Sequence, residues 1–460
     1  MSALRRLALA AAAGLSLALP VQAESLADTL VAAYRHSALI EQNRAVLRAA
    51  DEDVAIALSR LRPVVNWAAS HTVQRPEGSP TLRNSSVSLT ASLTLYDFGR
   101  SQLEIDGAKE LVLATRQALV SIEQDVLLNA TQAFFNVREA TQQVSLQQNS
   151  VDVLGRERQA AQDRFDVGEI TVTDVALADA QLAATQASLA AAQGQLEIAR
   201  EAFVLATGRR PGALAAPPPL PQLPPSADEA RAIAQRNHPA ILQSQRQAAA
   251  AEIRVAAAAA ERSPNLTANA GVGVTRSPNT LGDYSTRNSS QIGIELNQTL
   301  YSGGRLSATH RSAMAQRDQA RSGLLQTSRQ VALAVGEAWA NIDVARAQIR
   351  AIDQQISAAQ QAYDGVREEA QLGARTTLDV LDAEQSLLEA RANRITAESN
   401  LQLAHYQLLA AMGLLTVENL NLGIPTYDPT QYYNAVRNAP STSQQGESLD
   451  RVLRAIGRGN

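Results

Sequence analysis

Two carboxylates three residues apart, Asp379 and Asp382, have the spacing in this chain that most clearly suggests chemistry. Residues three apart on a helix share one face, so both side chains would project in the same direction. An earlier copy of the same segment contains Asp174 in place of Asp379 and Leu177 in place of Asp382. The helix dipole favours acidic residues in a first turn, which accounts for Asp174 and Asp379 but less well for Asp382.

A second interpretation of the two carboxylates applies if identical chains are arranged around a common axis. Three copies would place Asp379 and Asp382 in a ring of six carboxylates, a constriction that favours cations. Like-charge repulsion would raise the carboxyl pKa values in such a ring. We therefore interpret the pair as a filter or gate, beside the simpler interpretation as residues that start a helix.

Patterns that support catalysis or metal binding are missing from the sequence. The chain has no cysteine, which excludes disulfides and thiolate metal sites. Its histidines lack i, i+4 partners and neighbouring ligands; they are His36, His71, His238, His310 and His405. Gly303-Gly304-Arg305 lacks the Lys-Ser/Thr of a phosphate loop. We expect no enzyme, no metal and no cofactor, and a net charge of −4 argues against nucleic acid as a partner.

The segment that carries Asp379 belongs to an internal duplication with a constant offset of 205 residues. LYDFGR at 95–100 reappears as LYSGGR at 300–305. VGEITVTDV around Gly168 reappears as LGARTTLDV around Gly373. Each copy reads as helix, β-hairpin, very long helix, tight turn and long helix, so one architecture is used twice.

The duplication defines the domain organisation that we expect. Its parts are a first repeat at 24–210, a proline-rich linker at 211–225, a second repeat at 226–415 and a tail at 416–460. Residues 1–23 have a basic start, an apolar run and the small-residue end Val21-Gln22-Ala23, which are typical of a signal peptide. The tail reads as loop except for a short amphipathic helix suggested by Leu449, Val452, Leu453 and Ile456.

The β-hairpins expected at 63–98 and 264–302 have the pattern of a sheet with one apolar and one polar face. Apolar residues hold every second position, as in Val87, Leu89, Ala91, Leu93 and Leu95, or Leu266, Ala268, Ala270, Val272 and Val274. Strands of about 10–13 residues can cross hydrocarbon when tilted. No apolar run long enough for a membrane helix follows residue 23, so only a closed β-barrel would cross a bilayer. An ordinary half-buried sheet packed on helices is the alternative.

Four strands cannot close a barrel, since single-chain outer-membrane barrels begin at about eight strands. Three copies would supply twelve, so we expect a homotrimer. Aromatic residues expected near the strand ends, Trp67, Tyr96 and Tyr301, would form a girdle at the membrane surface.

The helices are unusually long. One is expected from Leu26 to Leu61, and another from Arg100 to about Gln162, on the order of 90 Å. Beyond Gly168 apolar residues recur every seven positions, as in Val175, Leu182, Leu189, Leu196 and Phe203, which predicts a coiled coil. Leu381 and Leu388 lie off this seam in the second repeat. Helices with two packing faces can form a cylinder, whereas a plain two-helix hairpin needs a single stripe.

These features together resemble the TolC family of outer-membrane efflux and secretion channels, over roughly residues 24–415. LYDFGR and LYSGGR are similar to its strand-to-helix motif, with Thr94 and Thr299 where the family has proline. The absence of cysteine is typical of unlipidated members. The resemblance implies a mainly α fold with membrane β-structure: coiled-coil helices in a periplasmic α-barrel, and four strands per chain in a trimeric, twelve-stranded β-barrel.

The resemblance also implies partners. Val167-Gly168 and Leu372-Gly373 correspond to the tip turns that dock a periplasmic membrane-fusion adaptor, although Glu169 and Ala374 depart from the usual residue after glycine. The adaptor would connect the chain to an inner-membrane RND pump or ABC exporter. The remaining partner would be the lipid of the outer membrane of a Gram-negative cell, from which the protein would extend into the periplasm.

The same resemblance implies roles for the aspartates. Asp379 and Asp382 match the tunnel-entrance aspartates, and Thr173, Asp174 and Arg375 match the gating links between hairpins. We expect a passive exit duct of a tripartite efflux pump, of a type I secretion system or of both, gated at the periplasmic tip. A trimeric, membrane-anchored structural or adhesin-like coiled-coil protein is the alternative. The substrate stays open among drugs, peptides, metals and proteins.

Overall fold

The computed structural model describes residues 23–75, 77–78, 81–278, 283–425, 427–437 and 451. The signal peptide expected at 1–23 lies outside these residues except for Ala23, and so does the short helix expected around Leu449 to Ile456 except for Arg451. The chain forms two compact units, and α4 and α8 each contribute residues to both.

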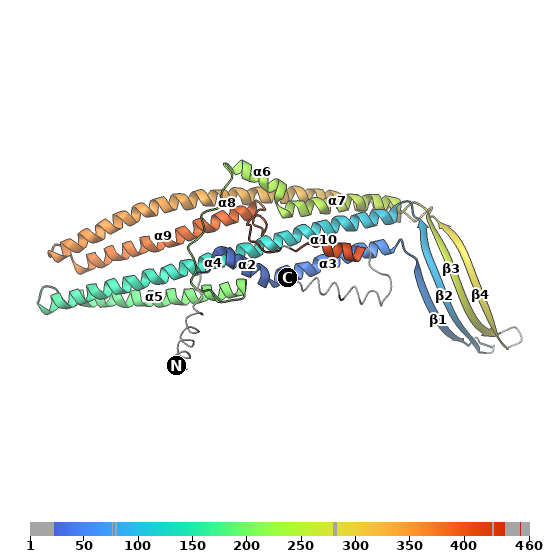
Figure 1. Ribbon diagram of the computed structural model, residues 1–460, viewed down its shortest axis with the longest axis horizontal. Coiled ribbons are helices and arrows are strands. Elements are labelled where there is room, and N and C mark those ends of the chain that lie inside the picture. The colour runs from blue at the N-terminus through green and yellow to red at the C-terminus, as the bar shows by residue number, and fades with distance from the viewer. Residues whose placement is uncertain are drawn as a thin grey trace, which may run out of the picture. The chain divides into compact units, whose positions relative to one another are not determined.

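The first unit consists of paired long helices. Its elements are α2 (Leu26–His36), α5 (Val172–Thr207), most of α6 (Ala227–Asn237), α9 (Thr377–Ala411), and the C-terminal parts of α4 (Arg100–Asp166) and α8 (Arg305–Gln371). α4 and α5 run side by side as one hairpin, and α8 and α9 form another (Figure 1). The two hairpins correspond to the two sequence repeats.

The second unit combines helices with the only strands in the described part of the chain. Its elements are α3 (Ala38–Ser59), α7 (Pro239–Ala260), α10 (Pro429–Arg437), the N-terminal parts of α4 and α8, β1 (Val64–Gln74), β2 (Leu82–Tyr96), β3 (Asn265–Pro278) and β4 (Tyr284–Asn297). The strands make one antiparallel sheet in the order β1-β2-β3-β4 (Figure 1). Both expected hairpins are confirmed, and pairing of β2 with β3 joins the repeats.

The strand register collects the alternating apolar residues on one face. Rows on this face include Val65–Ala91–Ala270–Ile292 and Trp67–Leu89–Val272. The rows between them carry small or polar residues, such as Ser88–Gly273–Ser289 and Thr90–Gly271–Gln291. Residues paired across antiparallel strands project from the same face, so one face is apolar and the other polar. Trp67, expected near a strand end, is the fourth of eleven residues in β1 and lies inside the apolar face.

The strand-to-helix corners of the two repeats have the same left-handed backbone. Phe98-Gly99 has φ angles of 55° and 85°, and Gly303-Gly304 has φ angles of 59° and 88°. Glycine adopts this conformation without strain, whereas Phe98 adopts it at a cost in backbone strain. The Asp97 carboxylate accepts a hydrogen bond from the Ser101 N–H at 2.8 Å, which caps the start of α4.

The long helices of the first unit pack with the expected seven-residue period. Val175, Leu196 and Phe203 on α5 are buried, as are Ala390, Ala397 and Ala404 on α9. Leu381 and Leu388, outside that seam, are buried as well, so α9 packs on more than one side within a single chain. A hydrogen bond from Gln181 Nε2 to Gln385 Oε1, 3.2 Å long, connects α5 of the first hairpin to α9 of the second.

The single helix expected from Leu26 to Leu61 is wrong, because the chain breaks at Ser37. Ser37 has an extended backbone with φ −64° and ψ 111°. Its hydroxyl accepts a hydrogen bond from the Ile40 N–H at 3.3 Å. A serine that bonds to the following turn competes with continuation of the preceding helix, so α2 and α3 replace one element.

The tail is not all loop, as the sequence suggested, because it contains α10. Three tyrosines of this segment pack on other helices of the second unit, to which the segment belongs. Arg44 lies over the Tyr427 ring at 5.0 Å, Arg116 lies over the Tyr433 ring at 5.6 Å, and the Tyr432 hydroxyl donates to Glu52 Oε1 at 2.9 Å. Leu47, Val54 and Val112 form the apolar cluster beneath.

Candidate functional site

The turns after α4 and α8 are built alike. Gly168 and Gly373 have φ angles of 82° and 78°. The glycine N–H groups bond to Phe165 O at 2.9 Å and Ala370 O at 3.1 Å, and the next N–H groups bond to Arg164 O and Glu369 O, both at 2.9 Å. This is a Schellman ending, which requires a left-handed residue and therefore favours glycine. The turns present Val167 and Leu372, which are 72% and 87% exposed.

Asp174 and Asp379 start α5 and α9 with the same capping box. The Asp174 carboxylate accepts hydrogen bonds from Thr171 N at 3.0 Å and Thr171 Oγ1 at 2.7 Å. Asp379 accepts from Thr376 N and Oγ1, both at 2.9 Å. The threonine hydrogen bonds hold the pKa of both carboxyls below the usual value. The helix-start interpretation therefore explains these two aspartates within one chain.

Asp382 lies one turn further along α9 and is exposed. It shares no role in the capping box, in which Asp379 supplies the carboxylate. The upward pKa shift expected for an assembled ring runs opposite to the shift of Asp379 in a single chain. Whether the ring reverses that shift stays a prediction.

The expected gating residues lie on the surface near the two turns. Arg375 Nε donates a hydrogen bond to Glu369 Oε2 at 2.9 Å, and the Asp174 carboxylate accepts one from Thr171 Oγ1. A single chain therefore pairs Arg375 with its own helix hairpin, not with Asp174. Thr173 is exposed beside Asp174. An Asp174–Arg375 link is accordingly a hypothesis about neighbouring copies.

A buried carboxylate that the sequence reasoning missed lies close to these residues. Glu384 on α9 is 9% exposed, and its Oε1 accepts a hydrogen bond from Ser150 Oγ on α4 at 3.3 Å. Burial raises the pKa of Glu384, and the nearby charge of Glu157 adds to the shift. One signal was available in the sequence: Glu384 interrupts an apolar stripe formed by Val380 and Leu387 at i−4 and i+3.

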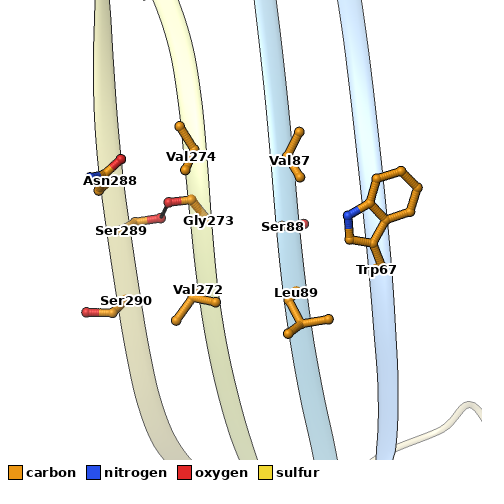
Figure 2. Close-up of a pocket in the computed structure, with 10 residues that line it drawn as sticks. All are labelled: Trp67, Val87, Ser88, Leu89, Val272, Gly273, Val274, Asn288, Ser289 and Ser290. Carbon is orange, nitrogen blue, oxygen red and sulfur yellow. Dashed lines mark hydrogen bonds between the residues drawn. The ribbon is translucent and has the colours of Figure 1, made fainter.

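The sheet contributes a surface without ionisable groups at its centre. Figure 2 shows Trp67, Leu89 and Val272 on neighbouring strands, with Ser88 and Gly273 in the next row. They belong to a hollow of about 470 Å³ whose ten lining residues include no titratable side chain. A surface of this composition has no titratable group that could act as an acid, a base or a charged ligand.

The described residues contain no group of three or more His, Cys, Asp or Glu side chains arranged to hold a metal ion. None of the helices among them is both long enough and apolar enough to span a bilayer.

The sequence matches a family of known proteins over both repeats. Residues 30–209 and 231–414 both match the model of the outer membrane efflux protein family. The chain belongs to this family. Each match contains one β-hairpin and one helical hairpin, so the family unit coincides with the duplicated architecture.

Several individual members of the outer membrane efflux protein family are similar over most of their length. The chain is 33% identical to the outer membrane efflux protein BepC of Brucella suis, covering 90% of this chain and 91% of the relative. It is 26% identical to the outer membrane protein TolC of Vibrio cholerae, covering 88% and 94%. A crystal structure of CusC has the same fold, with a TM-score of 0.75, 20% identity, and coverage of 84% and 92%.

Membership of this family establishes the general activity of the protein and its location in the cell. Members are passive channels and not enzymes, and they lie in the outer membrane of Gram-negative bacteria and cross the periplasm. TolC-like channels are trimers that work with adaptors and inner-membrane pumps. The exposed apolar face of the sheet is consistent with contact with lipid.

Proposed function

We propose that three copies of this chain form the exit duct of a tripartite efflux pump, a type I secretion system, or both. Molecules delivered by an inner-membrane transporter would cross the duct passively. The observation that carries this proposal is the four-stranded sheet with one apolar face, one polar face and two unpaired edges. Among the described strands, β1 pairs only with β2 and β4 pairs only with β3.

The direction of the edge strands permits closure. β1 and β4 run in opposite directions, because three antiparallel pairings separate them. β4 of one copy can therefore pair with β1 of the next in the antiparallel manner used throughout the sheet. Closure of three sheets into a twelve-stranded barrel would satisfy the edge backbone groups, which lipid cannot.

The first unit supports association of copies through its helices. α5 exposes Ile198 and Leu205, which are 63% and 83% accessible. Leu205 belongs to a groove of about 530 Å³ between α5, α4 and the residues that join α2 to α3. A neighbouring copy would cover this apolar surface and extend the helical hairpins into a cylinder.

The duplication supports the domain limits that we propose, repeats at 24–210 and 226–415 with a linker and a tail, since the family matches fall inside them. At the tips, Val167 and Leu372 would contact a membrane-fusion adaptor. Thr173, Asp174 and Arg375 would link neighbouring hairpins in the closed duct, and Asp379 with Asp382 would line the entrance. An iris-like loosening of these links would open it.

Engineered cysteines test the shared barrel directly, because the natural chain has none. A cysteine replacing Ala68 in β1 is combined with single cysteines at successive positions of β4 and oxidised in native outer membranes. A shared barrel gives dimers and trimers on non-reducing gels at positions whose Cα atoms lie about 5–6 Å apart. Each single-cysteine variant is the control. Purified protein that stays monomeric in buffer without detergent, with no ion conductance in a lipid bilayer, would refute the proposal.

A further inference from the structure

Two arginines interrupt the apolar face of the sheet near the hairpin connections. Arg276 on β3 pairs with Ser85. It lies two residues beyond Val274 and projects from the same face. Arg83 on β2 pairs with Val73, two positions beyond Ser85 on the same face. The register therefore places both guanidinium groups just past the last apolar row, at the end of the sheet away from its helices.

The other end of this face is different. Leu266 pairs with Leu296, and Tyr96 pairs with Leu266, so apolar and aromatic side chains finish the face there. From Leu266 to Val274 the face extends about 27 Å along the strand. At the usual barrel tilt this is an apolar band about 20 Å tall. In such a barrel Arg276 would lie where hydrocarbon gives way to headgroups.

The charged side chains on the apolar face of the sheet are all basic. Arg83 and Arg276 are exposed, and no Asp or Glu occupies the apolar-face positions of β1 to β4. The acids nearest in sequence, Glu77 and Asp283, lie in the hairpin connections. Among the described residues, neither guanidinium is paired with a carboxylate. The opposite face carries one cation and one anion, Arg287 and Glu295.

The surroundings of Arg276 add aromatic and polar groups. Its guanidinium lies over the Tyr284 ring at 5.5 Å. Tyr284, Thr286, Asn288 and Ser290 occupy successive apolar-face positions of β4, so hydroxyl and amide groups replace hydrocarbon beside the arginines. Tyrosine is enriched where a barrel meets headgroups. Guanidinium forks match phosphate oxygens in two-point hydrogen bonds, and nearby polar side chains suit sugar hydroxyls.

We propose that Arg83 and Arg276, with Tyr284 and the polar residues of β4, form a docking surface for phosphorylated glycolipid in the leaflet that the hairpin connections reach. The inference rests on the proposed function, since it requires the apolar face to meet lipid. A phosphorylated sugar with acyl chains fits both parts of the surface. Its phosphates meet the arginines and its chains lie along the apolar rows below them.

The test compares variants that differ only in the face they alter. Arg83→Gln with Arg276→Gln removes both cations from the apolar face, and Arg287→Gln removes the cation of the polar face in an adjoining row. Trimers are reconstituted in nanodiscs of phosphatidylcholine with lipid A, and the lipid A retained after gentle extraction is counted by native mass spectrometry. We expect about tenfold weaker retention for the double variant and wild-type retention for Arg287→Gln. Arg83→Lys with Arg276→Lys should restore part of it.

Three other outcomes would overturn the proposal. Equal retention by the double variant and by Arg287→Gln would show that the arginines do not select the lipid. Inorganic phosphate that displaces lipid A as readily as added lipid A would identify a soluble anion as the ligand. Equal retention of phosphorylated and dephosphorylated lipid A would point to acyl packing alone. Conductance of the same trimers in planar lipid bilayers distinguishes the two failures. Conducting trimers with unselective retention refute only this inference, whereas a wild-type protein without conductance refutes the proposed function.

Discussion

The Ser150 hydroxyl of the first helical hairpin donates a hydrogen bond to Glu384 Oε1 of the second hairpin at 3.3 Å. Tyr363 on α8 lies beside the same carboxyl, and a salt bridge of 3.1 Å from Arg367 Nε to Glu157 Oε1 connects α8 to α4 nearby. The two hairpins therefore meet around a buried acid close to the turns. A buried carboxylate is costly unless it is fully hydrogen-bonded, so this contact should depend on protonation.

The first prediction concerns pH. Burial raises the pKa of Glu384 above 4.5, with a further upward contribution from Glu157, while Ser150, Tyr363 and Arg391 act in the opposite direction. The raised pKa means that protonation stabilises the packed hairpins. This stability is fully present below pH 4.5 and is lost as pH rises through the raised pKa. The wild-type melting temperature should therefore fall over this range.

Glu384→Gln keeps the shape of the side chain and removes its titration. The variant should melt higher than wild type at neutral pH, by a few degrees, and show a smaller decline with pH. Glu389→Gln, on the exposed side of the same helix, is the matched control. Parallel pH profiles for wild type and Glu384→Gln would show that Glu384 does not titrate in this range.

Asp51 in the second unit gives a second pH prediction. It is fully buried, and burial raises its pKa to about 6, with the Arg116 charge opposing the shift and Glu52 adding to it. Protonated Asp51 stabilises the fold below pH 3.8, and this contribution is lost as pH rises through about 6. Asp51→Asn should therefore increase the free energy of unfolding above pH 6 by on the order of 2 kcal/mol. Thermal unfolding at neutral pH with an unchanged or lower midpoint would contradict this.

Much of the fold was predictable because its patterns are local. Alternation through Val87 to Leu95 specified both the strand and its faces, and the seven-residue spacing from Val175 to Phe203 specified the buried stripe of α5. Ser37 was missed because the apolar pattern continues through it. A single hydroxyl that bonds to the Ile40 N–H breaks the helix there.

The candidate site was only partly predictable. Gly168 and Gly373 could be assigned to turns because glycine is required in a left-handed helix ending. Glu384 was missed because a carboxylate in an apolar stripe has meaning only when its neighbour across the interface, Ser150, is known. The Asp174–Arg375 link stays a hypothesis about neighbouring copies, since within one chain Asp174 accepts a hydrogen bond from Thr171 and Arg375 donates one to Glu369.

The third prediction isolates backbone strain at a tip turn. Gly373 has φ 78°, and a Cβ added there would meet no atom within 4 Å. Gly373→Ala should therefore destabilise the turn by about 1–2 kcal/mol through backbone strain alone. Gly365→Ala, in α8 with equally open surroundings and helical backbone, should be neutral or stabilising. Hydrogen exchange at the turn measures the difference, and equal protection in both variants would exclude strain as the cause.

The fourth prediction addresses the proposed carboxylate ring. Hydrogen bonds from Thr376 keep Asp379 charged at neutral pH. Asp379→Asn with Asp382→Asn should reduce the preference for cations over anions in single-channel recordings, by severalfold, because the entrance loses its negative charge. Asparagine also caps helices, so the start of α9 should persist. Asp343→Asn removes an exposed carboxylate of α8 that belongs neither to the ring nor to the gating links, and it should leave selectivity unchanged. Unaltered selectivity in the double variant would contradict the ring and leave Asp379 with its helix-start role alone.

The last prediction concerns the gate. Arg375 is exposed, and its Nε donates a hydrogen bond to Glu369. In the proposed gate its terminal amino groups would bind Asp174 of a neighbouring copy. Arg375→Ser should raise the conductance of the isolated trimer severalfold, because the closed tip loses a link between copies. Glu369→Ala removes the contact within the chain and keeps the arginine, so it should leave conductance near the wild-type value. If both variants open the channel equally, the contact within the hairpin holds the tip closed and the link between copies does not.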